Sequence, residues 1–306
     1  MRNRLVVFGS TLLSVAFIVI VIGSYVIVAQ TAVSGTWTAD VRNEKDGKVH
    51  ISFDRRSVKG NRNQFGSEFA YEDLQGLSRE QAQNGKVSFR LVREAGTVEC
   101  EGSFVSGKGS GTFRFSPDTG YVAAMKARGF DFEKLKSKWD TVDQTGVEDR
   151  LLSAALINVT TALADDLNSA NFGKLDVDDL FKAAIFKIDS KFMAEMKATG
   201  FPDLKMEDLV KARIFKIDAD YVRQVNEMGF ASKDFESLVK FRIFKVTPEF
   251  LSELKTAGLS DVSSEDIVKF RIFKIDAEFI RKAKADDPKV TVEELVQMRI
   301  GVHKVK

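Results

Sequence analysis

The sequence is poor in the residues on which most enzyme chemistry depends. It contains one cysteine and two histidines in 306 residues. A lone thiol, Cys100, excludes an internal disulfide, and its place in an alternating apolar–polar segment predicts a small buried residue. Any Ser–His–Asp or Cys–His arrangement would have to use His50 or His303, and a zinc site would need ligands that the chain lacks. The sequence shows no catalytic constellation, so we expect a protein that is not an enzyme and that has no cofactor and no metal.

The sequence also lacks an excess of either charge. The chain has 46 Lys and Arg against 44 Asp and Glu, a formal net charge of +2. Such a balance gives no global field that would attract nucleic acid, so no nucleic-acid partner is expected and any charged partner must be recognised locally. The glycine-rich segment Gly107–Gly111 lies between two predicted strands and does not open a helix, which indicates a hairpin and not a phosphate-binding loop.

One long hydrophobic run is present, from Leu5 to Ala29, after the basic start Met-Arg-Asn-Arg. Its length exceeds a signal-peptide core and suits a bilayer span, which predicts a signal-anchor or transmembrane helix over residues 1–30. Arg2 and Arg4 would stay in the cytoplasm, so the bulk of a single-pass bacterial membrane protein would be extracytoplasmic. A long signal cleaved near Ala29 or Ala32, giving a secreted protein, stays open as an alternative.

Residues 34–115 follow a period of two, which is typical of β-strands. Gly-containing turns separate six alternating segments: Thr36–Val41, Lys48–Asp54, Gln64–Tyr71, Lys86–Arg93, Thr97–Phe104 and Gly111–Phe115. We expect a small antiparallel β-sandwich or partly closed barrel, with a core of Trp37, Phe53, Phe89, Phe104 and Phe113. The polar and basic stretch Arg55–Gln64 predicts an exposed loop, either a solvated hairpin tip or a contact with anionic head groups or cell-wall polymer.

The remainder of the chain is organised by a tandem repeat. The string IFKID at Ile185 returns at Ile214 and Ile272, and as IFKVT at Ile243, so that the start positions are 29 residues apart. Each unit reads as two short helices, the first capped by a residue such as Asp189 and the second by one such as Ser263. A fixed period of this length is typical of a solenoid. We predict an α-solenoid over residues 116–306, with about six units including degenerate early ones.

Basic residues recur at fixed places in these units and form a candidate stripe for binding a partner. The stripe comprises Lys211, Arg213, Lys216, Lys240, Arg242, Lys245, Lys269, Arg271, Lys274 and Arg299. One interpretation is a cationic surface for an acidic partner segment or an anionic polymer. The other is a self-satisfied ladder, because basic residues stabilise helix C-termini and acids such as Asp208 and Asp218 recur nearby.

The stretch Phe89–Phe115, followed by SPDTGYVAAMKARGF and by the repeated EDLVKARIFKID and TPEFLSELKTAGL, resembles poorly characterised bacterial envelope proteins with a β-domain and helical repeats. The repeats are similar to those appended to BlaR1-type membrane peptidases. The resemblance covers the chain from about Ser34 onward but carries no catalytic residue, since the HExxH motif of those peptidases is absent.

Together these patterns predict an α+β multidomain protein: a membrane helix, an antiparallel β-domain and a helical-repeat domain. The expected function is a membrane-anchored binding or adaptor protein that engages another envelope protein or peptide, with envelope signalling as one setting for this role. A self-assembling scaffold of the envelope is the first alternative, and an envelope hydrolase is the second. Self-association is therefore one of the partner relationships to test.

Overall fold

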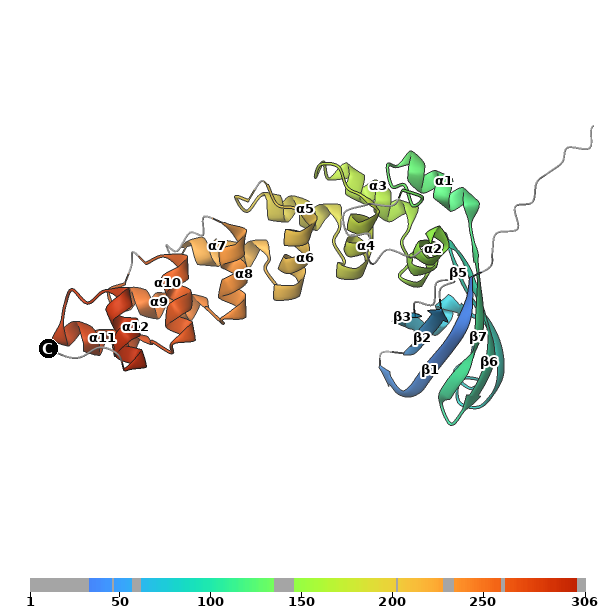
Figure 1. The fold of residues 1–306 in the computed structure, drawn as a ribbon, viewed down its shortest axis with the longest axis horizontal. Helices are drawn as coiled ribbons and strands as arrows, with labels where there is room; N and C mark the ends of the chain where they lie inside the picture. The colour runs from blue at the N-terminus through green and yellow to red at the C-terminus, as the bar shows by residue number, and fades with distance from the viewer. Residues whose placement is uncertain are drawn as a thin grey trace, which may run out of the picture. The chain divides into compact units, whose positions relative to one another are not determined.

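The computed structural model describes residues 33–45, 47–56, 62–134, 146–201, 203–227, 234–259 and 262–301 (Figure 1). The predicted signal-anchor over residues 1–30 lies outside these ranges, as does His303. Residues from Ala32 to Lys306 belong to one compact unit. Within the described ranges, no helix combines the length and the apolar character needed to cross a bilayer.

The N-terminal part of the unit, from Val33 to Pro117, is one antiparallel sheet of seven strands, in the order β3-β2-β1-β7-β6-β5-β4. The strands are β1 (Val33–Lys45), β2 (Lys48–Arg56), β3 (Arg62–Ala70), β4 (Leu74–Gln75), β5 (Gly85–Arg93), β6 (Gly96–Val105) and β7 (Lys108–Pro117). The sheet curls into a half-barrel (Figure 1), so the partly closed barrel describes it better than the sandwich. The six expected segments are all strands; β4 escaped prediction because two residues are too short to show a period.

Alternation places the large side chains on one face of this sheet. All five expected core residues, Trp37, Phe53, Phe89, Phe104 and Phe113, are at most 3 % exposed. The Trp37 ring lies 5.2 Å from Phe89 and 5.6 Å from Phe104, centroid to centroid. A Cβ at Gly109 would lie 2.5 Å from the Phe104 ring and 2.7 Å from Trp37, so only glycine leaves room for these rings. Cys100 is buried on the same face, and burial raises the pKa of its thiol.

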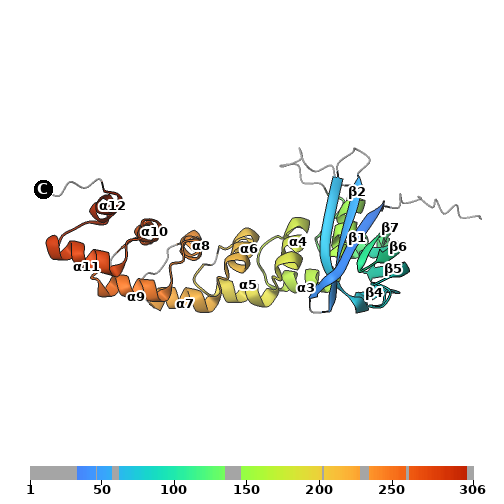
Figure 2. The ribbon, with the colours of Figure 1, turned by 90° about the horizontal axis from the view of Figure 1, so that it is seen from below.

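Twelve α-helices follow in the described part of the chain. They are α1 (Thr119–Ala127), α2 (Val147–Leu156), α3 (Thr161–Ser169), α4 (Val177–Phe186), α5 (Ser190–Lys197), α6 (Met206–Phe215), α7 (Ala219–Glu227), α8 (Phe235–Ile243), α9 (Pro248–Thr256), α10 (Ser264–Ile272), α11 (Ala277–Asp286) and α12 (Val292–Ile300). We call α3, α5, α7, α9 and α11 the first helices and α4, α6, α8, α10 and α12 the second helices. Each second helix packs against the next, and the two sets form separate rows (Figure 2).

Local chemistry explains where these helices begin and end. The side chains of Asp189, Thr247 and Asp276 each accept a hydrogen bond from the backbone N–H three residues on, as the sequence predicted. Ser263 and Thr291 cap α10 and α12 in the same way. These caps satisfy backbone groups that the first helical turn leaves unpaired.

Helix α2 joins the sheet to the helices. It packs against β1, β3, β6 and β7. Arg55, at the end of β2, forms an ion pair with Asp149 of α2; the two side chains are 16 % and 5 % exposed. Burial lowers the pKa of Arg55, and the nearby Glu148 opposes this shift.

The segment Arg55–Gln64 was expected to be a loop, but its two ends belong to strands. Arg55 and Arg56 belong to β2, and residues Arg62 to Gln64 belong to β3.

Candidate functional site: the C-terminal ends of the second helices

The arginines of the predicted stripe are used inside the array. Arg213 of α6 donates to the carbonyl of Lys187 at 2.6 Å, and Arg242 of α8 donates to the carbonyl of Lys216 at the same distance. Arg271 and Arg299 reach the carbonyls of Phe244 and Phe273, each at 3.2 Å. Each arginine thus satisfies a carbonyl near the C-terminal end of the preceding second helix, a group that the helix itself leaves unpaired.

The same guanidinium groups lie over aromatic rings of the first helix that precedes each of them, within the same unit. The distances from the guanidinium carbon to the ring centroid are 3.7 Å for Arg213 over Phe192 and 3.6 Å for Arg242 over Tyr221. Arg271 lies 4.8 Å from Phe250 and Arg299 lies 5.2 Å from Phe279. These are cation–π distances. Each arginine therefore links the first helix of its own unit to the C-terminal end of the preceding second helix.

A second basic column forms ion pairs between successive second helices. Lys211 of α6 lies 2.6 Å from Glu236 of α8, and Lys240 of α8 lies 3.8 Å from Glu265 of α10. Lys269 lies 2.8 Å from Asp266 of its own helix. An earlier pair, Lys182–Glu207 at 2.6 Å, continues the column toward α4. The partners across units are glutamates at the starts of the next second helices, whereas Asp208 pairs with Lys211 within α6, at 4.0 Å.

The third column has a different character. Lys187, Lys216, Lys245 and Lys274 stand at φ between 53° and 56°, the left-handed region in which glycine or asparagine is usual. All four are exposed, and in the part of the chain that the structure describes no carboxylate forms an ion pair with them. The equivalent position one unit earlier is Asn158, at φ 57°. Lys216, Lys245 and Lys274 belong to the predicted stripe, and Lys187 extends their column by one unit beyond it.

A column of isoleucines accompanies these lysines and was missed in the sequence. Ile185, Ile214, Ile243 and Ile272 are 49–55 % exposed, although each is the first residue of the repeated string. The helical period indicates this exposure. Ile214 is two residues past the buried Ala212 and so lies away from the buried face of α6. We call these four isoleucines with Lys187, Lys216, Lys245 and Lys274 the Ile–Lys strip.

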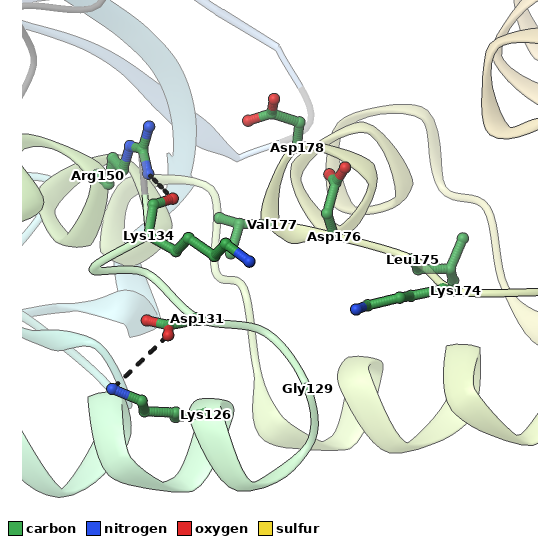
Figure 3. A pocket seen from close by; sticks show the side chains of 10 residues that line it. All are labelled: Lys126, Gly129, Asp131, Lys134, Arg150, Lys174, Leu175, Asp176, Val177 and Asp178. Carbon is green, nitrogen blue, oxygen red and sulfur yellow. Dashed lines mark hydrogen bonds and ion pairs between the residues drawn. The ribbon is translucent and has the colours of Figure 1, made fainter. Parts of the chain in front are cut away.

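A cleft of about 520 Å³ lies elsewhere in the helical part, between the α1–α2 and α3–α4 segments (Figure 3). It is lined by Lys126, Gly129, Asp131, Lys134, Arg150, Lys174, Leu175, Asp176, Val177 and Asp178. Much of its charge is already used: Lys126 pairs with Asp131 at 3.6 Å, and Asp176 caps α4. Lys134 and Lys174 extend into the space. None of these lining residues carries a hydroxyl, thiol or imidazole.

His50 lies on the exposed face of β2, opposite Asp40 of β1 in the sheet register. Its Nε2 is 3.3 Å from the Oγ of Ser52. A shallow hollow on this face is also lined by Thr38 and Lys108. Within the described ranges, no group of three or more His, Cys, Asp or Glu side chains is placed to hold a metal ion.

Comparison with known proteins adds no family: neither protein-family models nor curated proteins match this chain. The resemblance to the repeats of BlaR1-type peptidases stays a prediction, and the function must be argued from the site.

Proposed function

We propose that this protein is a membrane-anchored, extracytoplasmic binding or adaptor protein, built on an α-solenoid, which engages another envelope protein or peptide through the Ile–Lys strip. The observation that carries the proposal is that the basic columns differ in whether they make contacts within the array. Arginines and helix-body lysines are occupied within the array, whereas four apolar–cationic pairs stay exposed at a 29-residue period.

Two physical arguments support a binding role for these residues. A non-glycine side chain in the left-handed region costs free energy, of the order of 1 kcal/mol, and this cost recurs at four positions. A half-exposed isoleucine likewise leaves apolar area in water that burial against a partner would remove. The attraction of a lysine to the helix C-terminus offsets part of the first cost, but it does not account for the isoleucines.

The test is affinity purification of the full-length protein from its own membranes after mild crosslinking. A triple variant, Lys216→Glu, Lys245→Glu and Lys274→Glu, should lose a specific partner and stay folded. The matched control changes three exposed lysines of the first helices, Lys197→Glu, Lys255→Glu and Lys282→Glu, and should keep that partner. Loss of the partner in both variants, or in neither, would contradict the proposal.

A gentler variant separates binding from folding. Lys216→Gly removes the charge and places at φ 54° the residue best suited to it. We expect unfolding stability to stay the same or to rise by up to about 1 kcal/mol, while partner binding weakens. A loss of stability would mean that the lysine is structural.

The contact between His50 and Ser52 favours an envelope hydrolase as the second candidate. An imidazole beside a hydroxyl is the minimum for general-base activation. The site lies on an open strand face, which shields a developing oxyanion poorly from water. Release of product from ester or peptide substrates by the intact chain, abolished by His50→Ala and by Ser52→Ala alike, would establish this role.

A further inference from the structure

The Ile–Lys strip has a repeat distance that selects the shape of its occupant. Second helices pack directly on one another, and the bond from Arg213 to the carbonyl of Lys187 shows that their C-terminal ends are neighbours. Packed helices lie about 8–10 Å apart, so successive Ile–Lys pairs recur at roughly this interval. An occupant that uses all four pairs must present a matching group at the same interval.

Extended polypeptides meet this spacing in a particular way. A polyproline-II helix rises about 3.1 Å per residue and has three residues per turn, so every third side chain returns to the same face after about 9.3 Å. A β-strand covers a similar distance in three residues, but its third side chain points to the opposite face. The interval therefore matches a polyproline-II conformation.

An α-helical occupant fits less well. It would lay an apolar stripe on the surface with anchors at i, i+3, i+4 and i+7, which places about two anchors in each 10 Å. The strip offers one isoleucine per unit. A single apolar contact and a single cation per unit suit one apolar and one acidic residue in each turn of an extended chain.

We propose that the strip binds an extended acidic segment of another polypeptide, with a carboxylate at every third residue and an apolar residue between successive carboxylates. This inference rests on the proposed function and adds the class of partner. The carboxylates would pair with the four left-handed lysines, and the apolar residues would cover the half-exposed isoleucines. The two faces are complementary in charge, since the strip carries four cations and no paired acid in the described part of the chain.

The experiment titrates the full-length protein in detergent with fluorescent 15-residue peptides. One peptide repeats Glu-Pro-Val; a second has the same composition in shuffled order; a third places glutamate and valine at heptad spacing in an alanine helix. We expect the first to bind about tenfold more tightly than the second, and Lys216→Glu with Lys245→Glu to abolish the difference. The Lys197→Glu and Lys255→Glu control should retain it.

Three results would overturn the inference. The first is equal binding of the ordered and shuffled peptides. The second is tighter binding of the heptad helix. The third is that no peptide binds, while the protein binds vesicles of anionic phospholipid in a way that depends on the Ile–Lys strip. Each can occur while crosslinking still captures a strip-dependent protein partner, so the partner class can fail without the proposed function. Failure of the crosslinking experiment with success of the peptides would instead limit the strip to recognising acidic segments in isolation.

Discussion

At the scale of single residues, arginine and lysine have separate roles in these units although both read as basic positions in the sequence. A guanidinium is planar, so it can stack on a ring and donate at its edge to a carbonyl at the same time. Arg242 does both, toward Tyr221 and the carbonyl of Lys216. A lysine ammonium lacks this planar geometry, which explains why arginine stands where α8 meets both α7 and the end of α6.

Replacing Arg242 should therefore weaken the array. We expect Arg242→Ala to lower the free energy of unfolding by about 2 kcal/mol, from the lost charged hydrogen bond and the lost ring contact. Arg242→Lys should recover less than half of this loss. Lys245→Ala, at an exposed position nearby, is the control and should change stability by less than about 0.5 kcal/mol. Urea unfolding measures all three, and an Arg242→Lys variant as stable as the original would refute the stacking role.

The pairs between second helices predict a dependence on pH. The hydrogen bond from Lys182 holds the pKa of Glu207 below its usual range. The folded state therefore favours the ionised carboxylate, and its contribution is complete above the ordinary glutamate pKa and is lost as pH falls through the lowered value. Because the Glu207 side chain is 60 % exposed, we expect the ion pair to contribute less than about 1 kcal/mol to the free energy of unfolding.

The measurement is urea unfolding at several pH values between about 3 and 6, a range that brackets the ordinary pKa of glutamate. Glu207→Gln should flatten part of the decline in stability on acidification, and high salt should do the same. Glu253→Gln, on the exposed face of α9, should leave the curve unchanged. Identical curves for Glu207→Gln and the original protein would contradict the prediction.

At the scale of elements, the attachment of α2 to the sheet depends on a buried charge. Removing one member of the Arg55–Asp149 pair leaves the other as a buried charge without its partner. We expect Asp149→Ala to cost about 3 kcal/mol of unfolding free energy, whereas Arg55→Met combined with Asp149→Leu should recover most of it. Thermal unfolding of Arg55→Met, of Asp149→Leu and of the variant with both changes gives the coupling free energy between the two side chains. Additive losses in the double variant would show that the pair does not act as a unit.

Elements set by local rules could be predicted, and those set by distant pairing could not. Helix starts follow from capping residues such as Asp189 and Thr247, whose partners lie three residues away. The strands were visible by alternation, but whether they form one curled sheet or two depends on pairings such as Val33 with Phe115, which no local pattern reveals. The exposed isoleucines were missed because composition assigns isoleucine to the core, although their position on the helix says otherwise.

At the scale of the whole molecule, the helical array is held together by contacts between neighbouring helices. Helix α12 buries Leu295 and Val296, whereas Glu293 is exposed. Stability in such arrays depends on contacts between nearest neighbours, so removing a helix exposes the face of the helix against which it packs.

Removing α11 and α12 should create the self-association that the scaffold hypothesis requires. A chain that ends at Ile275 loses both helices and uncovers the part of α10 against which α12 packs. We expect a lower melting temperature and concentration-dependent association, measured by sedimentation velocity, because the new end exposes an apolar face. A chain that ends at Gly301 keeps α11 and α12 and should behave as the full-length protein does. If the full-length protein itself associates with rising concentration and the truncated one does not, the terminal unit is an assembly interface and the scaffold is the better account.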